Sequence, residues 1–326
     1  MPTFQEQMPY TDGEKRYHTL SFALRRRFGA PVWKAAVDAG FTCPNRDGSK
    51  GREGCAFCLG GSGDFTPGSH LSPVEQISSP VEQISAEQRR IRQRRPDAQV
   101  IAYFQAYTNT YAPAERLRMI YDPVVGLEGV CGISIATRPD CLPAEVLNYL
   151  EELAARTYLT VELGLQTIHD ATAERIRRGY GLEAFLEAVH RLHERRIRVC
   201  VHLINGLPGE EPEDMLETAR LIGGLRPGGV KIHALQILKD TPMADWWRRG
   251  EVNALTKEAY TDIVCRQLEW LPPETVIERL TGDGRKELLL APDWRCGKIA
   301  VLAGIDRRLR EGDRWQGKRF CMDSPT

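Results

Sequence analysis

The sequence predicts an α/β protein: a parallel sheet rolled into a partial barrel of about six strand–helix units, followed by a smaller C-terminal unit. Short apolar runs rich in β-branched residues alternate with amphipathic segments from about residue 31 to residue 245. Such alternation is typical of a parallel sheet with right-handed crossovers. The length of 326 residues is enough for one barrel and an appendage.

Six apolar runs predict the strands, in chain order Trp33–Val37, Val100–Phe104, Gly132–Ala136, Leu159–Leu163, Arg198–Ile204 and Val230–Leu235. Amphipathic segments between them predict helices, of which the clearest are Pro143–Arg156, Ala171–Arg178, Leu182–Arg196 and Glu213–Leu225.

The boundaries follow from changes in composition. Residues 1–30 precede the first strand and form an N-terminal extension, residues 31–245 form the barrel, and residues 246–326 form the C-terminal unit. Five of the six tryptophans lie in that last unit, at Trp246, Trp247, Trp270, Trp294 and Trp315.

The heptapeptide SPVEQIS occurs twice in tandem, at Ser72–Ser78 and Ser79–Ser85. Pro80 would interrupt a helix that ran through both copies. We therefore predict that the helix begins in the second copy, with Ser79 as the N-cap and Pro80 in the first helical position.

The charge, the apolar stretches and the cysteine count argue against a membrane-spanning protein and a disulfide scaffold. Lys plus Arg and Asp plus Glu both number 44, so any attraction for nucleic acid must be local. The longest apolar stretches are much shorter than the ~20 residues of a membrane span. Residues 1–10 lack the pattern of a signal peptide, and nine cysteines cannot all pair. We expect a cytoplasmic protein without a disulfide framework.

Three cysteines stand apart from the other six. Cys43, Cys55 and Cys58 lie in a Gly-, Asn- and Asp-rich loop that has little core for a thiol to pack into. Structural zinc requires four ligands, and His70 is the nearest candidate for the fourth. A [4Fe–4S] cluster held by three cysteines leaves one iron open for a substrate or cofactor. The spacing favours the cluster over zinc and over free thiols.

Seven motifs, taken together and in order, resemble the YhcC/YtqA-like branch of the radical S-adenosylmethionine (SAM) enzymes, and the core also resembles the Elongator catalytic subunit. They are DAGFTCPNRDGSKGREGCAFC, YFQAYTNTYA, GISIATRPDCL, VELGLQTIHD, INGLPGE, RLTGDGRKELLLAPDW and WQGKRF. The resemblance covers nearly the whole chain. It implies a partial (β/α)6 radical SAM barrel with a small C-terminal α/β extension.

The resemblance also implies the cofactors. Cys43, Cys55 and Cys58 would hold a [4Fe–4S] cluster, and SAM would bind the fourth iron through its amino and carboxylate groups. One-electron cleavage of SAM would then give a 5′-deoxyadenosyl radical, so no catalytic side chain is expected beyond the cluster and SAM.

Only some of the SAM-binding motifs of the family can be recognised in this sequence. The glycine-rich turn that most relatives have after the second strand is replaced here by residues 105–110, and the Glu of many relatives is replaced by Ala136. Strand alternation turns Glu162 away from Val161 and Leu163, toward either the barrel interior or a helix layer. The candidate SAM-binding residues are Tyr107, Thr108, Glu162, Gln166, Arg178, His202, Asn205 and Gly206.

The same resemblance suggests tRNA as the substrate, modified at the C5 side chain of the wobble uridine in the 5-methylaminomethyluridine pathway. It implies an electron donor such as flavodoxin or ferredoxin, and a downstream methyltransferase. Arginine-rich stretches at residues 89–95 and 295–319 are candidate RNA contacts. We expect a basic patch at the barrel mouth made of Lys298, Arg314, Lys318 and Arg319.

Two other functions compete with tRNA modification. The first is a radical SAM enzyme that acts on a small metabolite or a protein. The second is a non-catalytic binding protein stabilised by zinc.

Overall fold

A computed structural model describes residues 8–11, 13, 15–60, 79–282 and 287–320. Its centre is one seven-stranded parallel sheet with the order β1-β2-β3-β4-β5-β6-β8, and a two-stranded antiparallel ribbon pairs β7 with β9. The strands are β1 (Val32–Val37), β2 (Gln99–Phe104), β3 (Val130–Thr137), β4 (Tyr158–Gln166), β5 (Arg198–Asn205), β6 (Gly229–Ala234), β7 (Ile237–Leu238), β8 (Val276–Arg279) and β9 (Leu289–Ala291).

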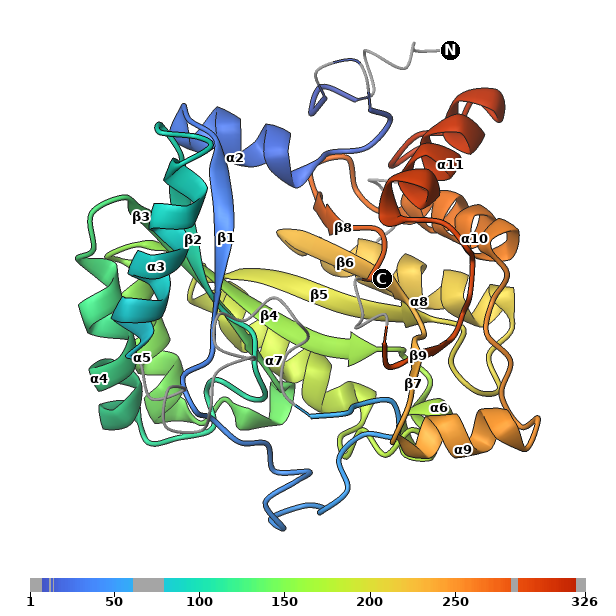
Figure 1. Cartoon of the computed structure of the whole chain (residues 1–326), viewed down its shortest axis with the longest axis horizontal. Helices are drawn as coiled ribbons and strands as arrows, with labels where there is room; N and C mark the ends of the chain where they lie inside the picture. The colour runs from blue at the N-terminus through green and yellow to red at the C-terminus, as the bar shows by residue number, and fades with distance from the viewer. Residues whose placement is uncertain (1–7, 12, 14, 61–78, 283–286, 321–326) are drawn as a thin grey trace.

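The sheet curls into a half-barrel, and helices cover its outer side (Figure 1). They are α2 (Leu20–Phe28), α3 (Pro80–Arg92), α4 (Ala114–Val125), the 3-10 turn η2 (Pro139–Cys141), α5 (Ala144–Ala154), α6 (Asp170–Arg175), α7 (Leu182–Glu194), α8 (Pro212–Leu225), α9 (Pro242–Arg248), α10 (Lys257–Trp270) and α11 (Lys298–Glu311).

The predicted fold class is confirmed. Each of the six predicted strands and four predicted helices corresponds to an observed element within a few residues. The seventh strand, β8, was not predicted, because its four residues Val-Ile-Glu-Arg contain no apolar run. Since β8 comes from the C-terminal unit and extends the sheet, that unit is part of the barrel wall.

Strand alternation divides the apolar core from a polar interior. On β4, Val161 and Leu163 are fully buried in the apolar core, whereas Glu162 between them points into the half-barrel. Layers of branched apolar side chains usually fill such a barrel. Here charged side chains occupy much of it, which makes the interior a candidate site.

The second SPVEQIS copy forms the start of α3, as predicted. The hydroxyl of Ser79 accepts a hydrogen bond from the backbone N–H of Glu82, and the Glu82 carboxylate accepts one from the Ser79 N–H. Pro80 occupies the first turn, where no N–H is needed. The first copy lies outside the described residues.

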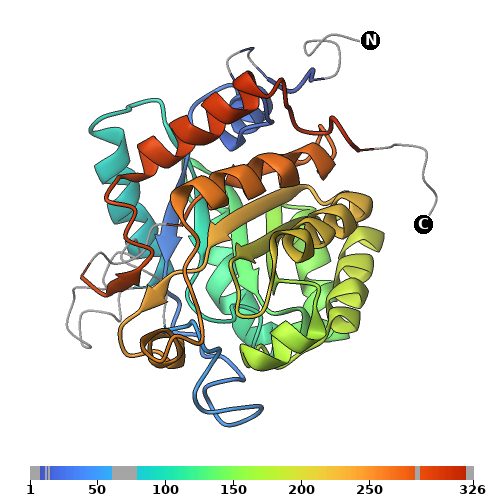
Figure 2. The same cartoon turned by 90° about the vertical axis from the view of Figure 1, so that its right-hand side faces the viewer.

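The C-terminal segment packs at the end of the barrel where strands start. The side-chain amide of Gln316 donates to the carbonyls of Pro272 and Thr275, just before β8, and the Arg319 N–H donates to the Glu269 carbonyl. Because the mouth lies at the opposite ends of the strands, the prediction that Lys318 and Arg319 belong to its rim is wrong. Helices α10 and α11 lie side by side beyond the sheet (Figure 2).

Within the described residues, none of the helices combines the length and the hydropathy needed to cross a bilayer.

Candidate active site

The three-cysteine loop is fixed in place at the strand carboxyl ends. It hangs below the sheet in Figure 1. Short turns fold it locally: the Cys43 carbonyl accepts from the Arg46 N–H at 2.8 Å, and the Cys55 carbonyl accepts from the Cys58 N–H at 2.9 Å. Ala56, between the last two cysteines, is fully buried; its N–H donates to the Ile176 carbonyl, and its carbonyl accepts from the Met243 N–H.

Asn45 connects this loop to the segment after α6. Its Nδ2 donates to the carbonyls of Arg177 and Arg178, at 2.9 and 3.0 Å, and lies 3.5 Å from the Cys55 sulfur. Gly179 leaves room for this contact, because a Cβ there would lie 2.7 Å from Asn45 Oδ1 and its φ is +81°. The cysteine loop and the segment after α6 are therefore one packed unit.

A cavity of about 370 Å³ lies between the cysteine loop and the barrel interior. The three cysteines line one end of it. Its other walls come from the carboxyl ends of β2 to β6 and from β8, and include Tyr103, Tyr107, Thr108, Glu162, Gln166, His202, Lys231, His233 and Arg279.

The donor set fits a three-thiol cluster site. Cys43, Cys55 and Cys58 are all free and half-buried, and no other cysteine of the described residues lines this cavity. Burial, together with the nearby Cys58 sulfur, raises the pKa of the Cys55 thiol to about 11, so a bound cation is what would hold it as a thiolate. His70, the candidate fourth zinc ligand, lies outside the described residues.

Glu162 is the centre of a buried ionic network. Its carboxylate accepts from Lys34 Nζ at 2.6 Å, from Ser134 Oγ at 2.5 Å and from His202 Nε2 at 2.7 Å, and it also pairs with Lys231. Burial opposes ionisation, but Lys231, Lys34 and the His202 hydrogen bond outweigh it and hold the pKa of Glu162 well below its usual range.

The network continues toward the starts of the strands through a second carboxylate. Glu278 accepts from Lys34 and from Arg198, each at 2.7 Å. Burial again acts against ionisation, yet these two cations lower the pKa of Glu278 to about 2. Lys34 therefore bridges two carboxylates from different strands.

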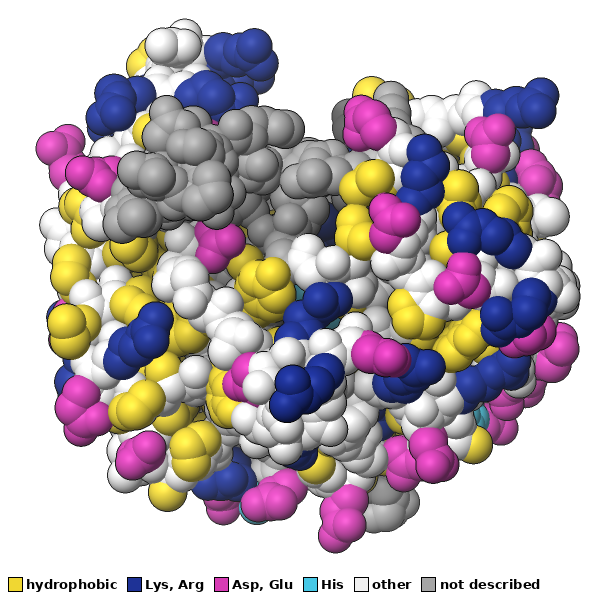
Figure 3. Space-filling model, turned by 60° about the horizontal axis from the view of Figure 1, so that its bottom comes forward, with side chains coloured by type: hydrophobic (Ala, Val, Ile, Leu, Met, Phe, Trp, Pro, Cys, Tyr) yellow, Lys and Arg dark blue, Asp and Glu magenta, His cyan; other side chains and the backbone are white. Residues whose placement is uncertain are grey.

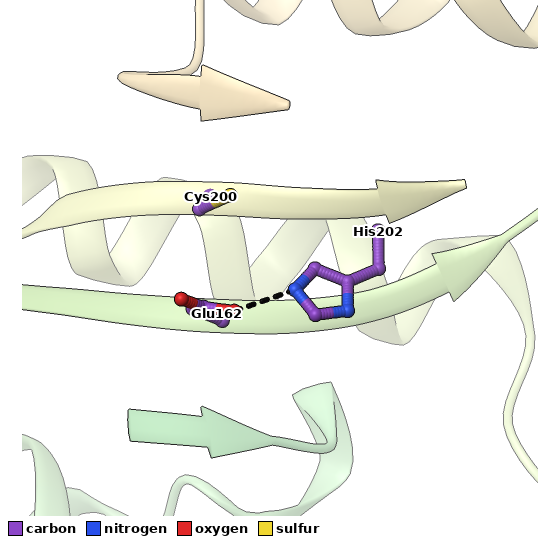
Figure 4. A group of neighbouring side chains, drawn as sticks. All are labelled: Glu162, Cys200 and His202. Atoms are coloured by element: carbon purple, nitrogen blue, oxygen red, sulfur yellow. Dashed lines mark hydrogen bonds and ion pairs between the residues drawn. The ribbon is translucent and has the colours of Figure 1, made fainter. Parts of the chain in front are cut away.

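Figure 4 shows His202 on β5 pointing at Glu162 on the neighbouring strand, with Cys200 close by. Donor atoms of these three side chains lie within 4.8 Å of one another. Burial, and then Lys231, lower the pKa of His202, so its ring is neutral near pH 7. Because Glu162 already pairs with two lysines, it has no free charge to offer a metal cation.

Comparison with known proteins agrees with this arrangement. The model of the Radical SAM superfamily matches residues 43–222, and that of the Radical_SAM C-terminal domain matches residues 227–311. The chain belongs to the radical SAM superfamily. It is thus a radical SAM enzyme, and the family implies a [4Fe–4S] cluster and SAM.

Some relatives of this radical SAM enzyme match it over nearly their whole length, and others share only part of their length with it. The YtqA protein of Bacillus subtilis is 47% identical over 313 residues, which are 96% of this chain and 95% of that protein. The tRNA uridine(34) acetyltransferase of Dehalococcoides mccartyi is 27% identical over 187 residues, 56% of this chain but 37% of that protein. The solved archaeal Elp3 of Methanocaldococcus infernus shares the fold, with a TM-score of 0.66 and 17% identity, over 87% of this chain and 64% of that one.

Five of the candidate SAM-binding residues of this radical SAM enzyme line the cavity: Tyr107, Thr108, Glu162, Gln166 and His202. Gln166 and Tyr107 both have a positive φ, of 65° and 60°, which is uncommon for residues other than glycine. The Tyr180 hydroxyl donates to the Gly164 carbonyl and lies 3.4 Å from Gln166 Oε1. The turn at the end of β4 thus presents Gln166 to the cavity.

Arg178 does not line the cavity. Its side chain is completely buried, and its guanidinium donates to the carbonyls of Leu165, Thr167 and Tyr180 at 2.5, 2.6 and 2.9 Å. The carbonyls of Leu165 and Thr167 flank Gln166, while the carbonyl of Arg178 itself accepts from Asn45. The geometry makes Arg178 a positioning residue for Gln166 and the cysteine loop, and it keeps the guanidinium out of the cavity where a SAM-binding residue was expected.

We predict that Arg178→Lys lowers the free energy of unfolding by about 3 kcal/mol, because an ammonium group cannot satisfy three buried carbonyls at once. Urea unfolding measures the change. Arg177→Lys is the matched control, since Arg177 is exposed and pairs with Glu53 at the surface. Equal stability of the two variants would contradict this role of Arg178.

Asn205 and Gly206 also lie outside the cavity lining. The amide of Asn205 forms a reciprocal pair with that of Gln267, at 2.8 and 2.9 Å, and is buried. Gly206 has a φ of +85°, and a Cβ there would lie 2.9 Å from the Leu255 side chain. Both residues shape the turn after β5 and fix it against α10 and the loop before that helix.

The sequence analysis did not identify the basic residues of the interior. Lys34, Lys231, His233 and Arg279 were not predicted as site residues, although Lys231 and His233 alternate with Val230 and Ile232 along β6. That alternation is the signal that could have identified them, because it places both on the inward face.

Proposed function

We propose that this radical SAM enzyme modifies the C5 side chain of the wobble uridine of tRNA, in the pathway to 5-methylaminomethyluridine. The observation that carries the proposal is the shared core with a relative named for uridine 34 of tRNA. The cavity supports it, because three thiols and a polar wall enclose a space in which an extruded base meets the cofactors.

In this proposal, Cys43, Cys55 and Cys58 would hold the [4Fe–4S] cluster, and SAM would bind its open iron. When bound, the pair would supply the one-electron chemistry that removes a hydrogen atom from the substrate. Tyr107, Thr108, Gln166 and His202 line the space next to the cluster loop, and their polar groups orient SAM.

Glu162 acts differently from those four residues. Its carboxylate is already occupied by Lys34, Lys231 and His202, so it fixes His202 and the interior cations rather than binding SAM with a free charge. Arg178 holds the turn at the end of β4 in place, and Asn205 and Gly206 hold the turn after β5.

The remaining partners are part of the same proposal. The substrate is tRNA, the electron comes from flavodoxin or ferredoxin in the cytoplasm, and a separate methyltransferase completes the nucleoside. Lys and Arg side chains lie among Asp and Glu over the face in Figure 3, without one large basic field. RNA contacts are therefore expected to be local. The divisions at residues 30 and 245 remain predictions.

Nucleoside mass spectrometry of tRNA from a strain lacking this protein tests the function. We expect 5-methylaminomethyluridine to disappear and a precursor at the same position to accumulate. Wild-type protein should restore the nucleoside, and Cys55→Ala should not. An unchanged nucleoside profile would contradict the proposal and favour a small-molecule or protein substrate. A colourless, zinc-containing protein after anaerobic iron–sulfur reconstitution would favour the non-catalytic binding protein.

A further inference from the structure

The barrel interior, on the side of the cavity opposite the cysteines, carries an excess of positive charge. Four cationic side chains, from Lys34, Arg198, Lys231 and Arg279, share the barrel interior with the two carboxylates Glu162 and Glu278. His202 and His233 add no charge to this count, because burial lowers the pKa of both rings and leaves them neutral near pH 7. The interior therefore holds two more positive than negative charges.

Arg279 is the cation left without a carboxylate. Glu162 accepts four donors and Glu278 accepts from Lys34 and Arg198, so both are already paired with other cations. Arg279 is half-buried at the end of β8, and within the described residues neither its guanidinium nor the His233 ring has a hydrogen-bond partner. An unpaired cation in such a cavity raises the free energy of the folded protein, and a bound anion would lower it again.

SAM is a poor candidate for that anion. In the proposed function, its carboxylate and amine bind the open iron at the cysteine end. The parts of SAM that remain are a cationic sulfonium, a ribose and an adenine, and none of them neutralises a guanidinium. The cysteine thiolates would be committed to the cluster at the other end of the cavity, so the substrate is the component of the proposed complex that can bring an anion to Arg279.

We infer that Arg279, with His233 and Lys231 beside it, forms a subsite for an oxyanion carried by the substrate. The group is a carboxylate or a phosphate, since both accept the paired N–H donors of a guanidinium. This inference rests on the proposed function for the position of SAM and extends it by naming the chemistry of the substrate. A carboxylate would lie on the side chain of the base, and a phosphate in the backbone of the extruded nucleotide.

The first experiment uses reconstituted holoenzyme and tRNA from the strain lacking this protein. Arg279→Gln should raise the KM for tRNA about tenfold or more, since it removes a charge-assisted contact. Arg279→Lys should recover part of the loss. Arg220→Gln, on the outer helix α8 where Arg220 pairs with Glu213, is the control and should behave as wild type. An unchanged KM in Arg279→Gln, or an equal loss of SAM affinity, would overturn the subsite.

The second experiment does not depend on tRNA and uses acetate and inorganic phosphate as probes at matched ionic strength. Arg279→Gln should raise the melting temperature of the holoenzyme without added anion, because it removes uncompensated charge. Wild type should gain stability from acetate or phosphate, and the variant should not. A lower melting temperature in the variant, with no anion effect in wild type, would show that Arg279 is structural.

The two probes also separate the sources of the anion. Greater stabilisation by acetate supports a carboxylate on the base, and greater stabilisation by phosphate supports the backbone. If wild type fails to act on tRNA yet binds an anion through Arg279, the proposed substrate is wrong and the subsite stands. If the wild-type enzyme acts on tRNA, but neither its stabilisation by anions nor its KM for tRNA depends on Arg279, the subsite is wrong and the proposed function stands.

Discussion

Replacing Cys43, Cys55 or Cys58 singly by Ala is expected to abolish the ~400 nm iron–sulfur absorption and all cleavage of SAM. The three thiols line one end of one cavity, on a loop fixed by Asn45 and by the buried Ala56. Because each thiol holds a different corner of the cluster, the two that remain cannot retain it. Iron content, the absorption spectrum and 5′-deoxyadenosine formation measure the loss.

Two other cysteines provide the matched controls. Cys131 is half-buried on β3, Cys296 is exposed before α11, and neither lines the cavity. Their Ala variants should keep both the spectrum and SAM cleavage. A Cys58→Ala protein with a full complement of four irons and normal turnover would refute the ligand assignment.

Glu162→Gln is expected to lower the free energy of unfolding by about 3–5 kcal/mol at pH 7, the usual cost of removing one partner of a buried ionic pair. The neutral amide leaves Lys34 and Lys231 facing each other without the carboxylate between them. Urea unfolding followed by circular dichroism measures the change. Glu152→Gln is the control, since Glu152 forms an exposed pair with Arg118 and its loss should leave the midpoint unchanged.

The pH dependence of the stability provides a further test of the role of Glu162. The pKa of Glu162 is lower in the folded protein than in the unfolded chain. Its contribution to stability is therefore present above the unfolded value of about 4.5 and is lost as the pH falls below it. The difference between wild type and Glu162→Gln should shrink between pH 5 and pH 3, within the range where the fold survives. A difference that stays constant over this range would contradict the ionic role of Glu162.

The sequence alone was enough for the framework. The strand and helix positions followed from hydrophobic periodicity, which is a local property, and the capping box at Ser79 followed from residue type and spacing. The cysteine loop was recognised in the same way, because three thiols in a polar loop have no apolar role. The alternation around Glu162 also predicted correctly that it faces away from Val161 and Leu163.

What each inward residue contacts was decided only by the tertiary structure. Arg178 satisfies backbone carbonyls behind the site, and Asn205 pairs with Gln267, which lies 62 residues away in the chain. Lys34 and Glu278 lie on strands more than 200 residues apart, and they meet because the sheet curls. Periodicity reports on which side of the sheet a residue lies, whereas a hydrogen bond or an ion pair depends on which strand lies opposite to it across the half-barrel. The short strand β8 leaves no periodic signal in the sequence, and so the inward positions of Glu278 and Arg279 could be found only in the folded chain.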